Sequence, residues 1–168
     1  MGERGDWEAL AARLQALEDV EAVKQTMYRY WRCLDDKLSD DELRECFTED
    51  ATADYGMPGW RAEGREELLR FLGPERRPEM QLSHGGHNSE VTLTGPDSAS
   101  GHFRLHDWVT LEGRTTMRGF GRYDVLFVRR GGAWRIHRLA LRYQYREEHH
   151  LFVDNRNVGF GEVQHLKR

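Results

Sequence analysis

The sequence predicts an α+β fold in which helices cover one face of a curved antiparallel sheet. Across the first third of its 168 residues, apolar side chains recur at steps of three and four, as in amphipathic helices. From residue 84 onward the period changes to two, as in strands. Short, turn-rich segments separate these later runs, so they predict an antiparallel meander. Helices followed by a run of strands indicate that the two kinds of element form separate layers.

Three helices are expected before the meander. The first covers residues 17–35, and its larger apolar residues share one face: Leu17, Val20, Val23, Met27, Tyr30, Trp31 and Leu34. A shorter helix begins after it, where Ser39 and Glu42 have the S-x-x-E spacing of a capping box. The third lies within residues 64–73 and is closed by a glycine.

The expected strands occupy most of the rest of the chain. Residues 51–56 form a short strand, followed by a turn at residues 57–60. The meander consists of residues 87–94, 99–112, 116–130 and 133–146. We expect one domain over residues 1–168, with a core at about 17–150 and a tail at 151–168 that lacks a clear period.

Composition and charge exclude several classes of function. The 25 lysines and arginines are scattered and face 29 acidic residues, for a net charge of -4, which argues against nucleic acid as a partner. No run approaches the roughly 18 apolar residues of a membrane span, and the first residues lack the apolar region of a secretory signal. Cys33 and Cys46 fall within predicted helices without C-x-x-C spacing, so buried free thiols are expected. These features indicate a soluble, cytoplasmic protein with a small-molecule ligand or a protein partner.

The segment GHFRLHDWVTL carries a charged exception on an apolar face. Alternation places five residues on one side: Phe103, Leu105, Asp107, Val109 and Leu111. Burying a carboxylate without a partner is costly, so Asp107 must be hydrogen-bonded, paired or beside a polar cavity. An arginine on a neighbouring strand and a protonatable histidine are the two candidate partners.

Three residues of the N-terminal half are candidates for the border of a pocket. Tyr30 continues the apolar face of the first helix, and Asp35 follows five residues later at the helix end. Tyr55 closes the short strand in phase with Ala51 and Ala53. The pattern is also consistent with two core tyrosines, and for Asp35 it favours a solvated position at the helix end.

The segment LSHGGHNSEVTL contains two histidines separated by two glycines. Their spacing matches no familiar zinc pattern such as H-E-x-x-H, and the pair His149–His150 is an equally weak metal signal. Alternation places His87 in phase with Val91 and Leu93, which favours His87 over His84 as the inward residue. No nucleophile elbow, phosphate loop or dinucleotide fingerprint occurs, so acid/base chemistry without a metal or cofactor is favoured.

Several segments together resemble a known family. They are YRYWRCLDDKL, FTEDATADYG, GREELLRFL, SHGGHNSEVTL, SGHFRLHDW and YREEHH. Their combination is similar to the SnoaL-like group of the nuclear-transport-factor-2-like superfamily, above all to the bile-acid 7α-dehydratases and more distantly to scytalone dehydratase. The resemblance implies a cone made by a strongly curved antiparallel sheet, with N-terminal helices closing an internal apolar pocket.

The resemblance also implies the site. The dehydratase's active positions fall on Tyr30, Asp35, Tyr55, His84 and Asp107. On this basis His84 points into the cone because the glycines let the strand bend, and Asp107 is the carboxylate that orients His84. The residues expected around the substrate are Trp31, Trp60, His87, Asn88, Phe103 and Leu105, with His87 in a supporting position.

The implied activity is loss of water from a hydroxylated polycyclic or steroid-like ketone. His84 removes the activated C–H proton, while Tyr30, Tyr55 and Asp35 hold the substrate's oxygens in roles that the sequence leaves interchangeable. The expected partner is a small apolar hydroxylated substrate, with no metal and no cofactor, in a homo-oligomer for which a trimer is favoured over a dimer. Polyketide cyclases, ketone isomerases and non-catalytic binding proteins or oxygenase small subunits are the alternatives with the same fold.

Overall fold

The computed structural model describes residues 2–73, 80–111 and 115–149, and the predicted tail at 151–168 lies outside these residues. Helices and strands follow one another along the chain as predicted from the change of period. The helices are α1 (Gly2–Asp35), α2 (Asp40–Arg44) and α3 (Arg65–Leu72). The strands are β1 (Phe47–Asp54), β2 (Arg61–Glu63), β3 (Met80–Gly95), β4 (Ser98–Leu111), β5 (Thr115–Arg130) and β6 (Ala133–His149).

The described strands form one six-stranded sheet in the order β2-β1-β6-β5-β4-β3. The α+β class and the antiparallel meander of β3 to β6 are confirmed. The sheet is mixed, however, because β1 pairs with β6 in parallel. A parallel pair needs a long connection, and here β2, α3 and strands β3 to β5 lie between the two strands along the chain.

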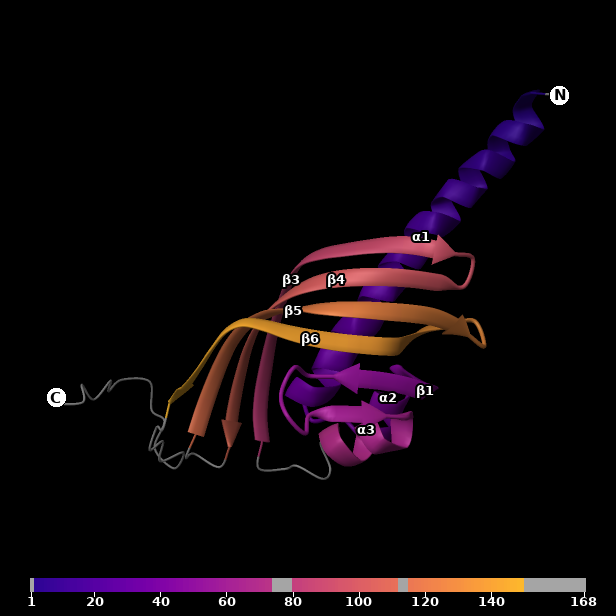
Figure 1. Cartoon of the computed structure of the whole chain (residues 1–168). Helices are drawn as coiled ribbons and strands as arrows, with labels where there is room; N and C mark the ends of the chain where they lie inside the picture. The colour runs from indigo at the N-terminus through magenta and orange to yellow at the C-terminus, as the bar shows by residue number, and fades with distance from the viewer. Residues whose placement is uncertain (1, 74–79, 112–114, 150–168) are drawn as a thin grey trace.

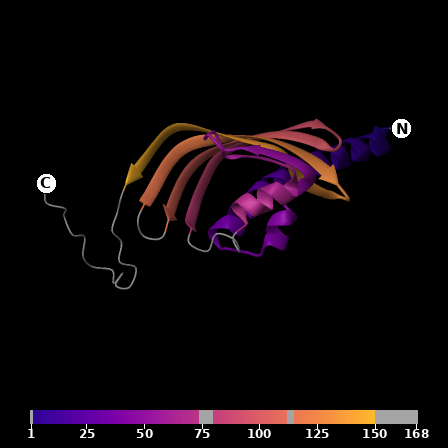
Figure 2. The same ribbon diagram turned by 60° about the horizontal axis from the view of Figure 1, so that its bottom comes forward.

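The long strands bend sharply, so that the sheet forms a half-open shell over the helices (Figures 1 and 2). One cause is a register shift between β5 and β6 at Phe120 and Gly121. Gly121 is needed there, since a Cβ atom would lie 2.7 Å from the carbonyl oxygen of Arg142. The C-terminal part of α1 lies against the concave face, and the space beneath the bend becomes the pocket described below.

Only the C-terminal part of α1 packs on the sheet. Val23, Met27, Tyr30 and Leu34 are buried, as the spacing predicts. The prediction was wrong for Leu17, which is 68% exposed. The first half of the helix extends past the end of the sheet (Figure 1), so no part of the described sheet covers that position.

The short elements behave largely as their sequences indicate. The capping box at α2 is present, since Ser39 and Glu42 each accept a hydrogen bond from the other's backbone N–H. Cys33 and Cys46 are free and buried as expected, although Cys46 lies beyond the end of α2 rather than within a helix. Among the described helices, none combines the length and apolar composition needed to cross a bilayer.

Candidate active site

The last turn of α1 and the first half of β3 place a histidine against an aspartate. The His84 ring nitrogen Nδ1 lies 2.6 Å from Asp35 Oδ1, and the His84 backbone N–H donates to Asp35 Oδ2 at 2.8 Å. The His84 side chain is 5% exposed and that of Asp35 22%. A carboxylate held by two hydrogen bonds, one of them from the backbone, fixes both the position of the ring and its rotation.

Trp31 supports the ring from one side. Residues four apart on a helix share a face, so Trp31 and Asp35 both reach β3 from α1. The Trp31 and His84 rings are nearly parallel, with 6.4 Å between their centroids and an interplanar angle of 11°. Gly86 makes this approach possible, because a Cβ atom at residue 86 would overlap the Trp31 ring.

The phase of β3 changes just beyond its two histidines. Met80, Leu82 and His84 point inward, whereas further along the strand Val91 and Leu93 do. The change occurs where the pairing with β4 shifts between His87 and Glu90, and Asn88 adopts a left-handed φ of 49° there. Alternation counted back from Val91 therefore pointed to the wrong histidine, and His84 is the inward one as the resemblance implied.

Asp107 is inward and buried, but its partner differs from the prediction. It stands directly opposite His84 in the register of β3 and β4, yet the residue that donates to its carboxylate is Tyr143 of β6. The carboxylate that orients the His84 ring is that of Asp35, which corrects the role assigned to Asp107. Among the described residues, the hydrogen bond to the Asp107 carboxylate comes from the Tyr143 hydroxyl and not from the predicted arginine or histidine.

Four tyrosines form the polar lining of the same space. The hydroxyls of Tyr30 and Tyr55 lie 3.0 Å apart, and Tyr30 also interacts with Tyr123. Burial raises the pKa of Tyr30, Tyr55 and Tyr123 above the ordinary value. For Tyr143, burial and then the nearby charge of Asp107 raise the pKa. All four phenols therefore stay protonated near neutral pH and act as hydrogen-bond donors.

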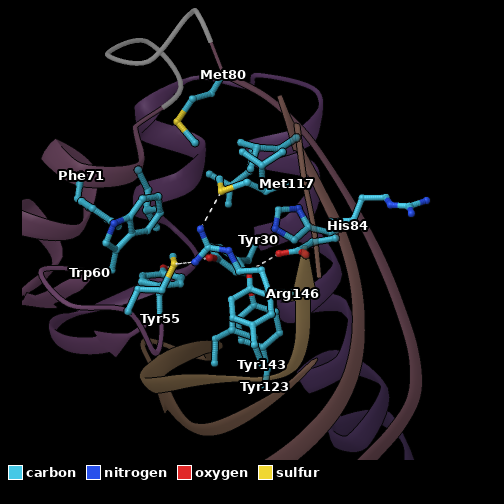
Figure 3. Close-up of a pocket in the computed structure, with 18 of the residues that line it drawn as sticks. Tyr30, Tyr55, Trp60, Phe71, Met80, His84, Met117, Tyr123, Tyr143 and Arg146 are labelled. Carbon is cyan, nitrogen blue, oxygen red and sulfur yellow. Dashed lines mark hydrogen bonds between the residues drawn. The ribbon is translucent and has the colours of Figure 1, made fainter. Parts of the chain in front are cut away.

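These groups open onto one pocket beneath the bend of the sheet (Figure 3). Its walls are otherwise largely apolar, and they include Leu34, Phe71, Leu72, Leu82, Val109 and Leu141. The empty space is about 860 Å³ including its open mouth, and little of it is wide enough for a water molecule. The pocket is thus narrow, with an apolar body and a few convergent polar groups, as is typical of small-molecule sites.

Arg146 lies at this pocket with its charge turned toward sulfur atoms. Its guanidinium contacts the thioethers of Met57 and Met117, which are weak acceptors (Figure 3). Its guanidinium carbon also lies 6.0 Å from the centroid of the Tyr143 ring. A cation in such a setting is suited to an oxygen atom of a bound ligand.

The structure brings together most, but not all, of the predicted site. Tyr30, Tyr55, His84, Asp107 and Trp60 line the pocket, and Asp35 stands behind His84. Three residues predicted to touch the substrate belong to the packed core instead: Trp31, Phe103 and Leu105. In this core the Trp31 and Phe103 rings meet edge to face.

His87 and Asn88 do not line the pocket, which corrects their prediction as substrate contacts. Both are exposed, where the phase of β3 changes. The His87 ring packs against His106 on the outer face of the sheet, with 5.2 Å between centroids. His84 and His87 lie three residues apart, so alternation counted from Met80 puts His84 inward and His87 outward.

The sequence reasoning missed Tyr123, Tyr143 and Arg146. Alternation could have found the two tyrosines, since Tyr123 is in phase with the buried Val125 and Tyr143 with the buried Leu141. Arg146 carried no such signal. Strict alternation after Tyr143 would bring Tyr145 to the pocket. The register shift at Phe120 and Gly121 brings Arg146 there instead.

Metal-ligating side chains do not cluster in the part of the chain that the structure describes. No group of three or more His, Cys, Asp and Glu side chains lies close enough there to hold an ion. Of the pair His149–His150, His150 lies outside the described residues. The chemistry that the described site offers on its own is proton transfer by His84 and hydrogen bonding by the phenols.

Comparison with known proteins agrees with this architecture. A family model described as a SnoaL-like domain matches residues 15–140. Solved structures with the same fold include a candidate scytalone dehydratase from Novosphingobium aromaticivorans, with a TM-score of 0.71 and 23% identity over 81% of this chain and 91% of that one. A type 2 hexachlorocyclohexane dehydrochlorinase has a TM-score of 0.67 and 19% identity, covering 85% and 92% of the two chains. A type 3 enzyme from Novosphingobium barchaimii has values of 0.65 and 20%, covering 85% and 93%. At these identities the structural likeness shows the fold alone.

Proposed function

Because this chain belongs to the SnoaL-like domain family, whose fold is that of the nuclear-transport-factor-2-like superfamily, we propose that it is a dehydratase working by acid/base catalysis. Its substrate is a hydroxylated polycyclic or steroid-like ketone or enone, and it uses neither metal nor cofactor. The observation that carries the proposal is the His84–Asp35 pair, held at 2.6 Å on the wall of a largely apolar, tyrosine-lined pocket.

The hydrogen bond between His84 and Asp35 supports His84 as the base. A carboxylate can only accept, so the proton between the two groups belongs to His84 Nδ1. The neutral ring then carries its free electron pair on Nε2. This nitrogen takes a proton from the carbon activated by the substrate carbonyl, and Asp35 stabilises the imidazolium that results.

The phenols accommodate the charge that develops next. As the C–H bond breaks, negative charge moves to the carbonyl oxygen. One hydroxyl of the Tyr30–Tyr55 pair donates a hydrogen bond to this oxygen, while the other donates to its partner. The electron pair then forms the new C=C bond and expels the hydroxyl group. The imidazolium returns its proton to the departing oxygen, so that one water leaves and His84 is restored.

Asp107 and Tyr143 complete the wall opposite α1. Asp107 stands across from His84 in the register, and the Tyr143 hydroxyl holds its carboxylate. This pair is placed to bind a hydroxyl of the substrate. Arg146 at the mouth suits an oxygen-rich end of an otherwise apolar ligand.

The support for a steroid-like substrate is the apolar lining of the pocket. Entry of a polycyclic ring system requires movement of flexible side chains, since little of the space admits even a water molecule. The long side chains of Met57, Met117 and Arg146 are the candidates for this movement.

A polyketide cyclase or a ketone isomerase is the second candidate. The same pair and phenols can form an enolate without expelling water. A binding protein or an oxygenase small subunit, the third possibility, has no use for a histidine oriented by two hydrogen bonds to one carboxylate. The product distinguishes the first two, and proton exchange distinguishes both from the third.

The test is mass spectrometry of a 7α-hydroxy-3-oxo-Δ4 steroid incubated with the protein. Native protein is expected to remove one water, and His84→Ala is expected to leave the steroid intact. If the native protein leaves the mass unchanged, the steroid assignment falls. Deuterium uptake by candidate ketones in heavy water then separates an enolising enzyme from a binder.

Assembly and location belong to the proposal as well. A homotrimer packed through the outer face of the sheet is in keeping with three large side chains exposed there, Trp108, Phe120 and Tyr145. A cytoplasmic location is proposed with it.

A further inference from the structure

The first half of α1 carries an apolar stripe that the described part of the chain leaves uncovered. Four large side chains are exposed there: Trp7 by 70%, Leu10 by 52%, Leu14 by 55% and Leu17 by 68%. Both ribbon views show this part of the helix reaching past the sheet (Figures 1 and 2). Large apolar side chains gathered on one exposed line are typical of a contact surface.

The spacing of the stripe is that of a helix pair. Steps of three, four and three residues place Trp7 and Leu14 at the a positions of a heptad, and Leu10 and Leu17 at the d positions. The side of α1 that meets the body of the molecule is a different one, where Asp19 and Val23 are buried. The stripe is therefore available while α1 remains packed on its own sheet.

The charges beside the stripe select the partner and its direction. In this heptad Arg13 takes a g position and Glu18 the following e position, the two positions that face each other across a parallel pair of identical helices. Within the described residues neither side chain has an ion-pair partner. An antiparallel pair centred on the stripe would bring Arg13 against Arg13 of the other copy.

We propose that the first half of α1 pairs in parallel with the same segment of a second copy of this chain. Trp7, Leu10, Leu14 and Leu17 form the seam, and Arg13 of each copy meets Glu18 of the other. Two heptads bury less than the roughly 1,200 Å² of a standard interface, so the association is weak and depends on protein concentration. It uses a surface separate from the outer face of the sheet and from the pocket.

Sedimentation velocity of the full chain over a range of concentrations tests the seam. The native mass is expected to double between dilute and concentrated samples. Leu14→Glu is expected to weaken the association at least tenfold, whereas Ala12→Glu, which adds the same charge on the opposite side of the helix, leaves it unchanged. Equal behaviour of Leu14→Glu and native protein would overturn the proposal.

A cysteine in the seam tests the direction. Leu17→Cys is expected to form a disulfide-linked dimer under oxidation, while native protein does not, because Cys33 and Cys46 are buried. In an antiparallel pair the two introduced thiols would be about 15 Å apart along the axis, from a rise of about 1.5 Å per residue. Absence of the cross-link would exclude the parallel arrangement.

Exchanging the charges tests the flanking pair. Arg13→Glu alone is expected to weaken the association several-fold, since it places two acidic residues together. Adding Glu18→Arg is expected to restore it. Failure of the second change to rescue the first would contradict the assigned contact.

Discussion

Among the described residues, two histidine–aspartate pairs have the same Nδ1 to Oδ1 distance. His84 and Asp35 lie 2.6 Å apart on the concave side of the sheet, and His102 and Asp124 lie 2.6 Å apart on the outer side. The residue types and the contact are identical. Any difference in reactivity between the two pairs must therefore come from the protein around them and not from the residues or their contact.

The surroundings differ in every other respect. The His84 side chain is 5% exposed and lies against the Trp31 ring, whereas that of His102 is 60% exposed. The second oxygen of Asp35 accepts from the His84 backbone, whereas that of Asp124 accepts from Arg122. One pair faces tyrosines and a pocket, and the other faces solvent. The comparison teaches that burial, a fixed ring and an adjoining cavity make such a pair a candidate catalyst.

The largest expected effect comes from removing the inner base. His84→Ala is expected to reduce turnover of the substrate by about 10³-fold or more, because His84 is the proposed base for the C–H proton. Steady-state kinetics checks this, with circular dichroism to show that the fold persists. Turnover at the native rate would remove His84 from the mechanism.

The next effect comes from the carboxylate behind that base. Asp35→Asn is expected to lower kcat by about 10²-fold, since an amide neither stabilises the imidazolium nor assigns the proton to Nδ1. KM is expected to change little, because Asp35 does not line the pocket. An effect confined to KM would mean that Asp35 acts on substrate binding instead.

Gly86→Ala tests the packing that holds the ring. The new Cβ atom would overlap Trp31, so we expect a loss of about 1–3 kcal/mol in stability together with a lower kcat. Gly85→Ala is the matched control, because its Cβ atom would meet its nearest neighbour, the Cβ of His106, at 3.4 Å. Thermal unfolding of both variants measures the difference in stability. Equal melting temperatures would contradict the close contact between Gly86 and Trp31.

Alkaline pH tests the buried phenols of the inner side. The pKa values of Tyr30, Tyr55, Tyr123 and Tyr143 are raised by burial, so the folded protein holds these protons more tightly than the unfolded chain. The resulting stability is complete below about pH 10, the ordinary pKa of tyrosine, and is lost as the pH rises above it. Tyr123→Phe is expected to reduce the slope of melting temperature against pH in that range. A slope equal to the native one would mean that Tyr123 titrates alike in both states.

The smallest effect is expected for the outer pair. His102→Ala should leave turnover unchanged and alter stability by no more than about 0.5 kcal/mol, because exposed ion pairs contribute little. The same assays as for His84→Ala measure it. A large loss of turnover would show that the outer face takes part in the reaction.

Patterns in the sequence predicted the elements of this fold better than the contacts of its site. Regular periods were enough for the long helix, the capped α2 and the meander. They failed at irregular points, since a register shift and a left-handed Asn88 exchanged the directions of His84 and His87. Resemblance supplied His84 but assigned it the wrong carboxylate. The choice between Asp35 and Asp107 depends on how a helix end meets a bent strand, which spacing along the chain does not encode.

The proposed mechanism depends most on the Asp35 carboxylate acting through His84. The most direct measurement is the rate of water loss from a 7α-hydroxy-3-oxo-Δ4 steroid by native protein, Asp35→Asn and Asp124→Asn under identical conditions. We predict that native protein and Asp124→Asn form the dehydrated product at the same rate, and that Asp35→Asn is slower by about 10²-fold. Equal rates for Asp35→Asn and native protein, or no product from native protein, would contradict the account.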